Sequence, residues 1–244
     1  MVSFERGGLT GVLAGFARRY DFRLLLAVLV AGIAQVAWAH GVEDKDAAYL
    51  QQITGVKVFP LMYLGAKHMV TGFDHLLFLT GVIFFLHRLK DIALYVTLFA
   101  VGHSLTLLSA VLMDIRANSH LVDAIIAISV VYKAFENIGG FDRLGLAIDL
   151  RKAVFGFGLV HGLGLATKIQ NLDLQRDGLV ENILSFNIGV ELGQFLALAL
   201  MLVGFRFWRR SSKFRGNAFL ANVVIMAIGF ALLGYQVTGY LVSA

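Results

Sequence analysis

Histidines and carboxylates lie inside long apolar stretches of this sequence, where polar groups are costly to place. The stretch HMVTGFDHLLFL carries His68, Asp74 and His75. At 100° per residue, these side chains fall within an arc of about 120° on one α-helix. A charged residue at the centre of a membrane helix costs about 2.5–3.5 kcal/mol. Such residues are therefore expected to face a functional site inside the protein.

Three further apolar stretches each contribute a polar group at a similar depth. His103 lies in GHSLTL, His161 in FGFGLVHGLGLA and Glu191 in SFNIGVELGQ. Each of them lies about ten residues into its segment, a rise of about 15 Å along a helix. His75 also lies near the middle of its predicted span. We expect these four groups to meet at one level, with His68 and Asp74 completing the ligand set. Five other residues are expected along the pathway or behind the ligands: Asp123, Ser104, Thr106, Asn187 and Gln194.

The types of these side chains indicate a divalent transition-metal ion. The sequence has no cysteine, so thiolate ligands are excluded. Neutral imidazole together with carboxylate suits nickel, cobalt, zinc, iron or copper. Magnesium and calcium instead prefer sites made only of oxygen. Two other interpretations stay open, namely hydrogen bonds between buried helices and a proton relay.

The elements that position these groups are predicted to be membrane-spanning helices. The chain has 244 residues, of which 58% are hydrophobic, and its mean hydropathy is +0.77. The apolar runs are continuous, whereas a membrane β-barrel shows alternation. We therefore predict an all-α, polytopic transmembrane bundle over residues 40–244, with six spans that each reach the ~20 residues needed. These spans are expected near 61–86, 92–112, 120–138, 152–170, 181–205 and 218–242.

The amino-terminal segment has the pattern of a signal peptide. Arginines precede an apolar run over 24–34, and the small-residue pattern Ala37-Trp38-Ala39 follows it. This order of a basic, an apolar and a small-residue region is typical of a cleavable signal. We predict that residues 1–39 are removed. A retained signal-anchor helix is the alternative and would give seven spans.

The charges of the loops predict the orientation of the bundle. The formal net charge is +5, and the loops near 87–91, 139–152 and 206–215 are rich in lysine or arginine. By the positive-inside rule these loops face the cytoplasm. In a bacterial inner membrane, the mature N-terminus and the C-terminus are then periplasmic. The positive charge is explained by topology, so nucleic acid is not an expected partner. The expected partners are the lipid bilayer and a metal ion, and a homo-oligomer or a larger membrane complex stays open.

Two glycine pairs predict where helices approach each other closely. Gly158 and Gly162 lie on the same side of their helix as His161. Gly189 and Gly193 lie on the face opposite Glu191. Small residues spaced by four let the backbones of neighbouring helices come near each other in a membrane. The second pair thus leaves Glu191 free to point into the polar interior.

At these motifs the chain resembles the HupE/UreJ family, small membrane proteins associated with nickel-hydrogenase and urease accessory genes. The resemblance runs from about His40 to the C-terminus, and its best piece is the H-x(5)-D-H spacing of His68, Asp74 and His75. GHSLTL, GLVHGLGLA and FNIGVELGQ also resemble family blocks. The resemblance implies a nickel, or nickel and cobalt, permease in which these three residues are essential for transport.

One motif departs from the pattern of the nickel-transporting members, which is F-H-G-x-A/V-H-G-x-E. This chain keeps His161 and Gly162. The earlier histidine of the pattern is absent from this chain, and the acid is replaced by Gly164. The resemblance therefore indicates a divergent member, and the metal stays open among nickel, cobalt, zinc, iron and copper.

Transport, rather than enzyme chemistry, is the expected function. The ion is expected to be captured near His68 and Asp123, passed to the deeper histidines and released to the cytoplasm. An intramembrane zinc hydrolase is one alternative, since three histidines, an acid and a serine occur in one bundle. A non-catalytic membrane subunit of a larger complex is another.

Overall fold

The computed structural model describes residues 54–170, 177–212 and 214–243, and all regular elements within these ranges are helices. The all-α prediction is therefore confirmed for the described part of the chain. The predicted signal segment, 1–39, lies outside it. The helices are α4 (Val58–Thr71), α5 (Phe73–Ile83), α6 (Leu89–Leu112), α7 (Ser119–Asn137), α8 (Gly140–Arg143), α9 (Leu150–Gln170), α10 (Leu179–Trp208) and α11 (Phe214–Ser243).

Three of the described helices are long and apolar enough to cross a membrane. They are α6, α10 and the part of α11 from Gly216 to Ser243. Large apolar side chains such as Leu105, Phe195 and Leu200 are exposed on α6 and α10, as on a lipid-facing surface. With 19 and 21 residues, α7 and α9 are also long enough, but both carry several charged residues. The total of six spans thus stays a prediction.

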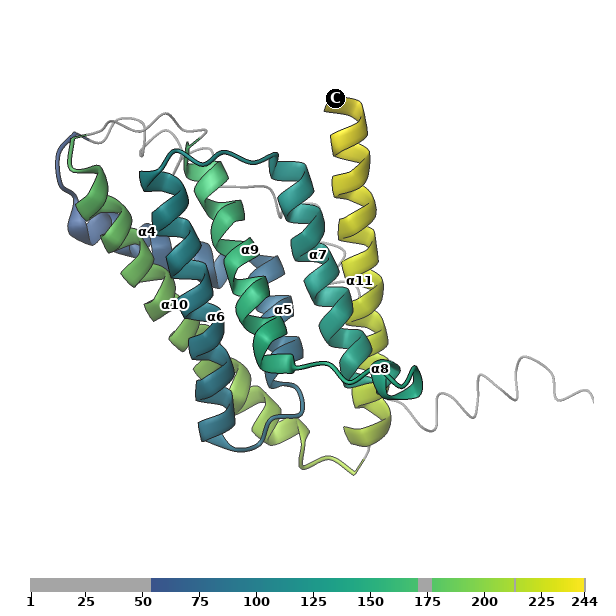
Figure 1. The fold of residues 1–244 in the computed structure, drawn as a ribbon. Coiled ribbons are helices and arrows are strands. Elements are labelled where there is room, and N and C mark those ends of the chain that lie inside the picture. The colour runs from purple at the N-terminus through teal and green to yellow at the C-terminus, as the bar shows by residue number, and fades with distance from the viewer. Residues whose placement is uncertain (1–53, 171–176, 213, 244) are drawn as a thin grey trace, which may run out of the picture.

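The bundle is built from three closely packed helix pairs around a short central helix. The pairs are α6 with α9, α4 with α10, and α7 with α11. Helix α5 contacts α4, α6, α7, α10 and α11, and it lies behind α9 in the view of Figure 1. From His75 onwards α5 is therefore largely buried among the other helices, which is where a buried polar site is to be expected.

Glycines bring the backbones of α6 and α9 close together, as predicted. A Cβ atom built on Gly158 would overlap the carbonyl of Phe99, and one on Gly162 would overlap the carbonyl of His103. From the other side, a Cβ on Gly102 would lie 2.6 Å from the carbonyl oxygen of Phe155. No side chain fits at these positions unless the two helices move apart.

The second predicted glycine pair joins α10 to α4. A Cβ on Gly189 would overlap the carbonyl of Met62, and one on Gly193 would lie 2.6 Å from the carbonyl oxygen of Ala66. Because this face of α10 packs on α4, Glu191 projects elsewhere, towards α6. The sequence interpretation of both glycine pairs is therefore confirmed.

The first predicted span, 61–86, is wrong as a single helix. The chain leaves the helical conformation at Gly72, whose ψ of 97° is extended, and α5 starts at Phe73. Glycine disfavours the interior of a helix. In addition, a Cβ at Gly72 would lie 2.8 Å from the carbonyl oxygen of His68 and 3.1 Å from Nδ1 of His75. The break therefore needs a residue without a side chain, and it lies between the two halves of the H-x(5)-D-H motif.

The two ends of the bundle differ in the loops they carry. The connections from α5 to α6, from α7 to α9 and from α10 to α11 lie at the lower end in Figure 1. The connection from α6 to α7 and the C-terminus lie at the upper end. The loops predicted to be basic thus share one end, although no membrane is present to define which side it faces.

Candidate functional site

Four histidines from four helices surround the start of α5. His75 of α5 lies at the centre, and the centroid of its ring is 4.9 Å from that of His161, 5.4 Å from His68 and 5.8 Å from His103. They come from α9, α4 and α6, respectively. We call His68, His75, His103 and His161 the histidine centre. The structure thus brings together all four histidines that the sequence analysis proposed as ligands.

The histidine centre is buried, and one ring nitrogen of each member lacks a hydrogen-bond partner. His75, His103 and His161 are at most 3% exposed. In all four rings, including that of the half-buried His68, Nε2 is buried and accepts or donates no hydrogen bond within the described structure. Buried polar atoms almost always have a partner, so each exception needs an explanation. Four such exceptions in one cluster point to a ligand for these nitrogens.

The carboxylate of Asp74 selects the tautomer of a neutral His75 ring. Nδ1 of His75 lies 3.0 Å from Oδ1 of Asp74, and the backbone N–H of His75 donates to the same oxygen at 2.9 Å. An ionised carboxylate only accepts hydrogen bonds, so Nδ1 carries the proton and Nε2 of the neutral ring has a free lone pair. Metal-binding histidines typically show this arrangement, with a carboxylate behind the ring.

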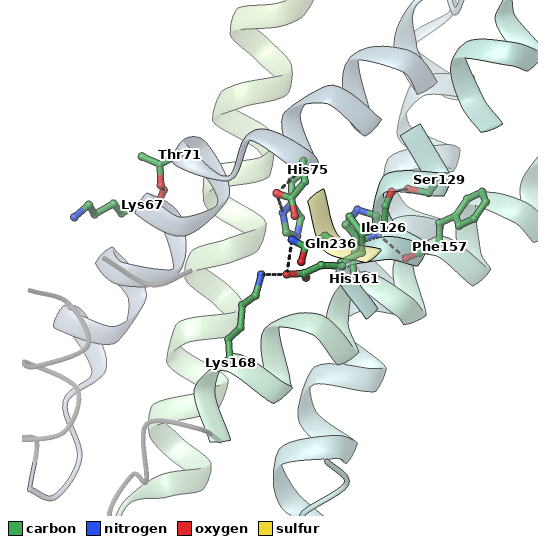
Figure 2. Close-up of polar contacts among 11 residues, drawn as sticks. Lys67, Thr71, His75, Ile126, Ser129, Phe157, His161, Lys168 and Gln236 are labelled. Atoms are coloured by element: carbon green, nitrogen blue, oxygen red, sulfur yellow. Dashed lines mark hydrogen bonds and ion pairs between the residues drawn. The ribbon is translucent and has the colours of Figure 1, made fainter. Parts of the chain in front are cut away.

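A backbone carbonyl does the same for His161. Nδ1 of His161 lies 2.8 Å from the carbonyl oxygen of Phe157, one turn earlier in α9. Since a carbonyl cannot donate, this ring also carries its proton on Nδ1. Figure 2 shows this contact at His161. Two of the four rings are therefore held in the tautomer that leaves Nε2 available to a metal ion.

Aromatic side chains close one side of the histidine centre. The rings of Phe99 and Phe78 lie 5.0 and 5.4 Å from that of His161, and both phenylalanines are buried. The ring of Phe186, from α10, lies 6.2 Å from that of His68. These side chains keep water from this part of the cluster, which strengthens electrostatic interactions within it.

Glu191 lies in a polar cluster of its own. Its Oε1 accepts hydrogen bonds from Ser104 at 3.2 Å and from Asn187 at 3.4 Å, and Asn187 also donates to Ser104 at 3.0 Å. Ser104 follows His103 in α6, so this cluster adjoins the histidine centre. The three residues were predicted as one ligand and two supporting groups, and the structure brings them together. The Ser104 hydroxyl donates to Glu191, an arrangement that does not activate it as a nucleophile by a histidine base.

The other predicted pathway residues have different surroundings. Thr106 donates to the carbonyl of Gly102 in its own helix, and Gln194 donates to the carbonyl of Val96. The Thr106 contact lies within α6 and the Gln194 contact joins α10 to α6, and the predicted pathway role of both residues stays a prediction. Asp123 instead forms an ion pair with Lys168, with Oδ2 and Nζ 3.1 Å apart.

The sequence analysis missed Lys168. Its charge acts on His68, Asp74 and His161, so it belongs to the electrostatic surroundings of the histidine centre. In Figure 2 a dashed line marks the ion pair in which the Lys168 side chain ends. The signal was its spacing, because residues seven apart lie on one face of a helix and Lys168 follows His161 by seven.

A second buried polar network lies around the far half of α5. Lys133 of α7 is 4% exposed, forms an ion pair with Glu136 and donates to Asn137 at 2.7 Å. Asn137 in turn donates at 2.8 Å both to the carbonyl of Gly81 in α5 and to Asn222 in α11. This network joins three helices and explains how a lysine is accommodated inside the bundle.

The side chains of the histidine centre are not arranged as a finished metal site. Within residues 54–170, 177–212 and 214–243, no three His, Asp or Glu side chains are positioned to hold one ion together. The rings lie close together, but their nitrogens do not form a set of three ligands for one ion. The assignment of the predicted ligands therefore stays a prediction.

Comparison with known proteins gives one match. The sequence model of the family described as HupE / UreJ protein matches residues 44–244. No curated protein and no solved structure matches the chain. The matched range contains all the helices described above, including the four that supply the histidine centre.

Proposed function

The chain belongs to the HupE/UreJ family, and we propose that it is a membrane permease for divalent transition-metal ions that pass through the histidine centre. The observation that carries this proposal is the set of four Nε2 atoms that are buried together without a hydrogen-bond partner. Hydrogen bonding between helices does not account for them, because these nitrogens form no such bonds. A proton relay would also need neighbouring donors or acceptors at these atoms.

The spacing of the rings supports an ion shared between them. A metal lies about 2.0–2.1 Å from an imidazole nitrogen, so rings that share one ion have centres roughly 5 Å apart. The three distances from His75 to its neighbours, 4.9, 5.4 and 5.8 Å, are of this size. Loading then requires changes in side-chain orientation rather than movement of whole helices.

The ligand types limit the ions that this site selects. Neutral imidazoles backed by the carboxylate of Asp74 suit nickel, cobalt, zinc, iron or copper, and they discriminate against magnesium and calcium. The family is associated with nickel and cobalt transport, which favours these two ions. For an ion that must leave again, ligands that do not converge fully in the resting state are an advantage, since conduction needs binding that is reversible.

The break at Gly72 supports a transport path at this depth. Many secondary transporters bind their substrates where a membrane helix is interrupted. We propose that the ion enters from the upper end in Figure 1, is bound beside the start of α5, and leaves towards the end with the basic loops. By the positive-inside rule that end is cytoplasmic. The membrane would be the bacterial inner membrane, and the ion gradient or membrane potential would supply the energy.

Metal accumulation in cells that express the full chain tests this function. Elemental analysis should show at least one of nickel, cobalt, zinc, iron or copper accumulating above the level of empty-vector cells. His75→Ala should abolish the excess. His87→Ala is the matched control, because His87 is exposed in the loop between α5 and α6 and should leave accumulation unchanged.

Reconstitution of the purified protein into liposomes separates transport from indirect effects on the cell. Entry of the same ion into the liposomes should depend on His75 and not on His87. Accumulation that His75→Ala leaves intact, at equal protein levels in the membrane, would contradict the role of the histidine centre.

A further inference from the structure

The ion pair between Lys168 and Asp123 lies between the histidine centre and the upper end of the bundle. Lys168 is near the end of α9 and Asp123 near the start of α7. Along α9, Lys168 is about 10 Å from His161, given a rise of 1.5 Å per residue. An ion that enters from the upper end thus reaches this pair before it reaches the histidines.

The carboxylate of Asp123 is only half used. Its Oδ2 faces the ammonium of Lys168 at 3.1 Å and accepts a hydrogen bond from Gln236 of α11 at 3.4 Å. Its Oδ1 is buried and lacks a partner within the described structure. On the neighbouring α9, Gly164 leaves this oxygen unobstructed, since even a Cβ built there would stay 3.6 Å away. The free oxygen is available to a cation.

The geometry of Asp123 is fixed from a third helix. Gln236 holds Oδ2, and the side-chain oxygen of Gln236 lies 2.8 Å from Nδ1 of His120 in α7. His120 is held against Gly239, where a Cβ would approach its ring to 2.6 Å. Asp123 is therefore held by hydrogen-bonded neighbours, whereas Lys168 reaches it through a long side chain that is 22% exposed.

We propose that Asp123 is an outer cation subsite and that Lys168 occupies it as a tethered competitor, a role that rests on the proposed function of the histidine centre. The ammonium neutralises the carboxylate while no ion is present. An entering divalent ion displaces the ammonium from Asp123. Because the Lys168 side chain is partly exposed, the ammonium then turns towards the surface. The ion then passes to the imidazoles.

Competition by Lys168 has a consequence for selectivity. Magnesium and calcium bind through oxygen ligands and would gain only the carboxylate of Asp123. Nickel or cobalt also gains the imidazoles below, which offsets the loss of the ion pair. Lys168 therefore excludes hard cations from the entrance, although it does not contact the histidine rings.

Initial rates of nickel and cobalt uptake by liposomes that contain the full chain test this role. Lys168→Met should lower the half-saturating concentration by roughly tenfold, because an opposing unit charge is removed from the entrance. It should also make uptake sensitive to millimolar-range magnesium, which should have little effect on the parent protein. Lys152→Met is the matched control in the same helix. The Lys152 side chain is 86% exposed, and its Nζ lies 3.9 Å from Oδ2 of Asp149, so this variant removes a charge away from the entrance.

A double-mutant cycle distinguishes a competitor from a purely structural ion pair. Asp123→Asn should raise the half-saturating concentration. If Lys168 acts on Asp123, then Lys168→Met should produce no magnesium sensitivity in the Asp123→Asn background. Lys168→Gln also removes the charge but keeps a hydrogen-bond donor at this position. It replaces Lys168→Met in these measurements if Lys168→Met reduces the amount of folded protein.

The outcomes separate this inference from the proposed function. Uptake that requires His75 but shows the same magnesium sensitivity in the parent, Lys168→Met and Lys168→Gln overturns the role of Lys168 alone. Equal effects of Lys168→Met with and without Asp123 also overturn it. If the parent protein takes up none of nickel, cobalt, zinc, iron and copper, the proposed function as a permease is itself contradicted.

Discussion

Asp74 holds the ring of the residue that follows it: its Oδ1 lies 3.0 Å from Nδ1 of His75 and 2.9 Å from the backbone nitrogen of the same residue. Both residues stand in the first turn of α5, directly after the break at Gly72. A carboxylate is favoured at this place because the start of a helix carries a partial positive charge. One side chain thus stabilises the start of the half-helix and orients the central ring of the histidine centre.

Asp74→Asn should weaken metal binding more than it weakens the fold. Removal of a carboxylate behind a metal-binding histidine typically lowers affinity by about 10–100-fold. Metal retained by the purified protein after equilibrium dialysis, measured by elemental analysis, should fall accordingly. Asp114→Asn is the control, because Asp114 is exposed and pairs with Arg116 outside the bundle. Equal affinities of the Asp74 and Asp114 variants would contradict the orienting role.

Gly162→Ala should destabilise the bundle, whereas Gly156→Ala should not. A Cβ at Gly162 would overlap the carbonyl of His103, while at Gly156, in the same helix, it would have no atom of another element within 4 Å. Overpacking of this kind costs about 1–3 kcal/mol. The midpoint of thermal unfolding in detergent should therefore drop for Gly162→Ala only. Similar midpoints for the two variants would show that α6 and α9 can separate without cost.

Arg209→Met should loosen the far end of α5. The guanidinium donates from Nη2 to the carbonyl oxygens of Ile83 at 2.7 Å and Phe84 at 2.8 Å. The Ile83 oxygen also accepts from the backbone N–H of Leu86 at 3.1 Å, so the Phe84 oxygen depends most on Arg209. Loss of a partner for a buried acceptor costs about 1–3 kcal/mol. Unfolding in detergent should shift to lower temperature for Arg209→Met, relative to Arg210→Met. The second variant removes the same charge from an exposed neighbour, so a shift common to both would reflect charge alone.

The orientation of the bundle can be tested with single cysteines, because the chain contains none. Ile115 in the loop between α6 and α7 and Leu146 in the loop before α9 are both exposed. By the positive-inside rule, Ile115→Cys should react with a membrane-impermeant maleimide in spheroplasts, and Leu146→Cys only after the membrane is opened. The reverse pattern would invert the proposed direction of the path.

The interruption of the first predicted span shows the limit of apolar periodicity. Polar residues between Lys67 and His75 interrupt the apolar run from 61 to 86, but a count of apolar residues does not mark Gly72 as the point of the break. The break depends on the contacts that a side chain at this position would make with the carbonyl of His68 and the ring of His75. These contacts exist only once the chain has turned, so the arc calculated for a straight helix did not describe the motif.

The partners of individual polar groups were similarly decided by packing. Glu191 was expected with the histidines, but it accepts hydrogen bonds from Ser104 and Asn187. Asp123 and Lys168 lie 45 positions apart in the chain and meet because α7 packs on α9. The separation of two residues in the sequence does not predict such an ion pair. The pair forms only if the faces of the two helices that carry these residues are turned to each other.

By itself, the sequence determined the helical class of the described part and the glycine faces on which α6, α9, α10 and α4 pack. These follow from a constant rise per residue and from the cost of polar groups in an apolar segment. The tertiary structure decided the break at Gly72 and the rotation of each helix about its axis. That rotation places the rings of three other histidines around His75 and sets Lys168 against Asp123. It depends on close packing between helices rather than on the order of residues within one.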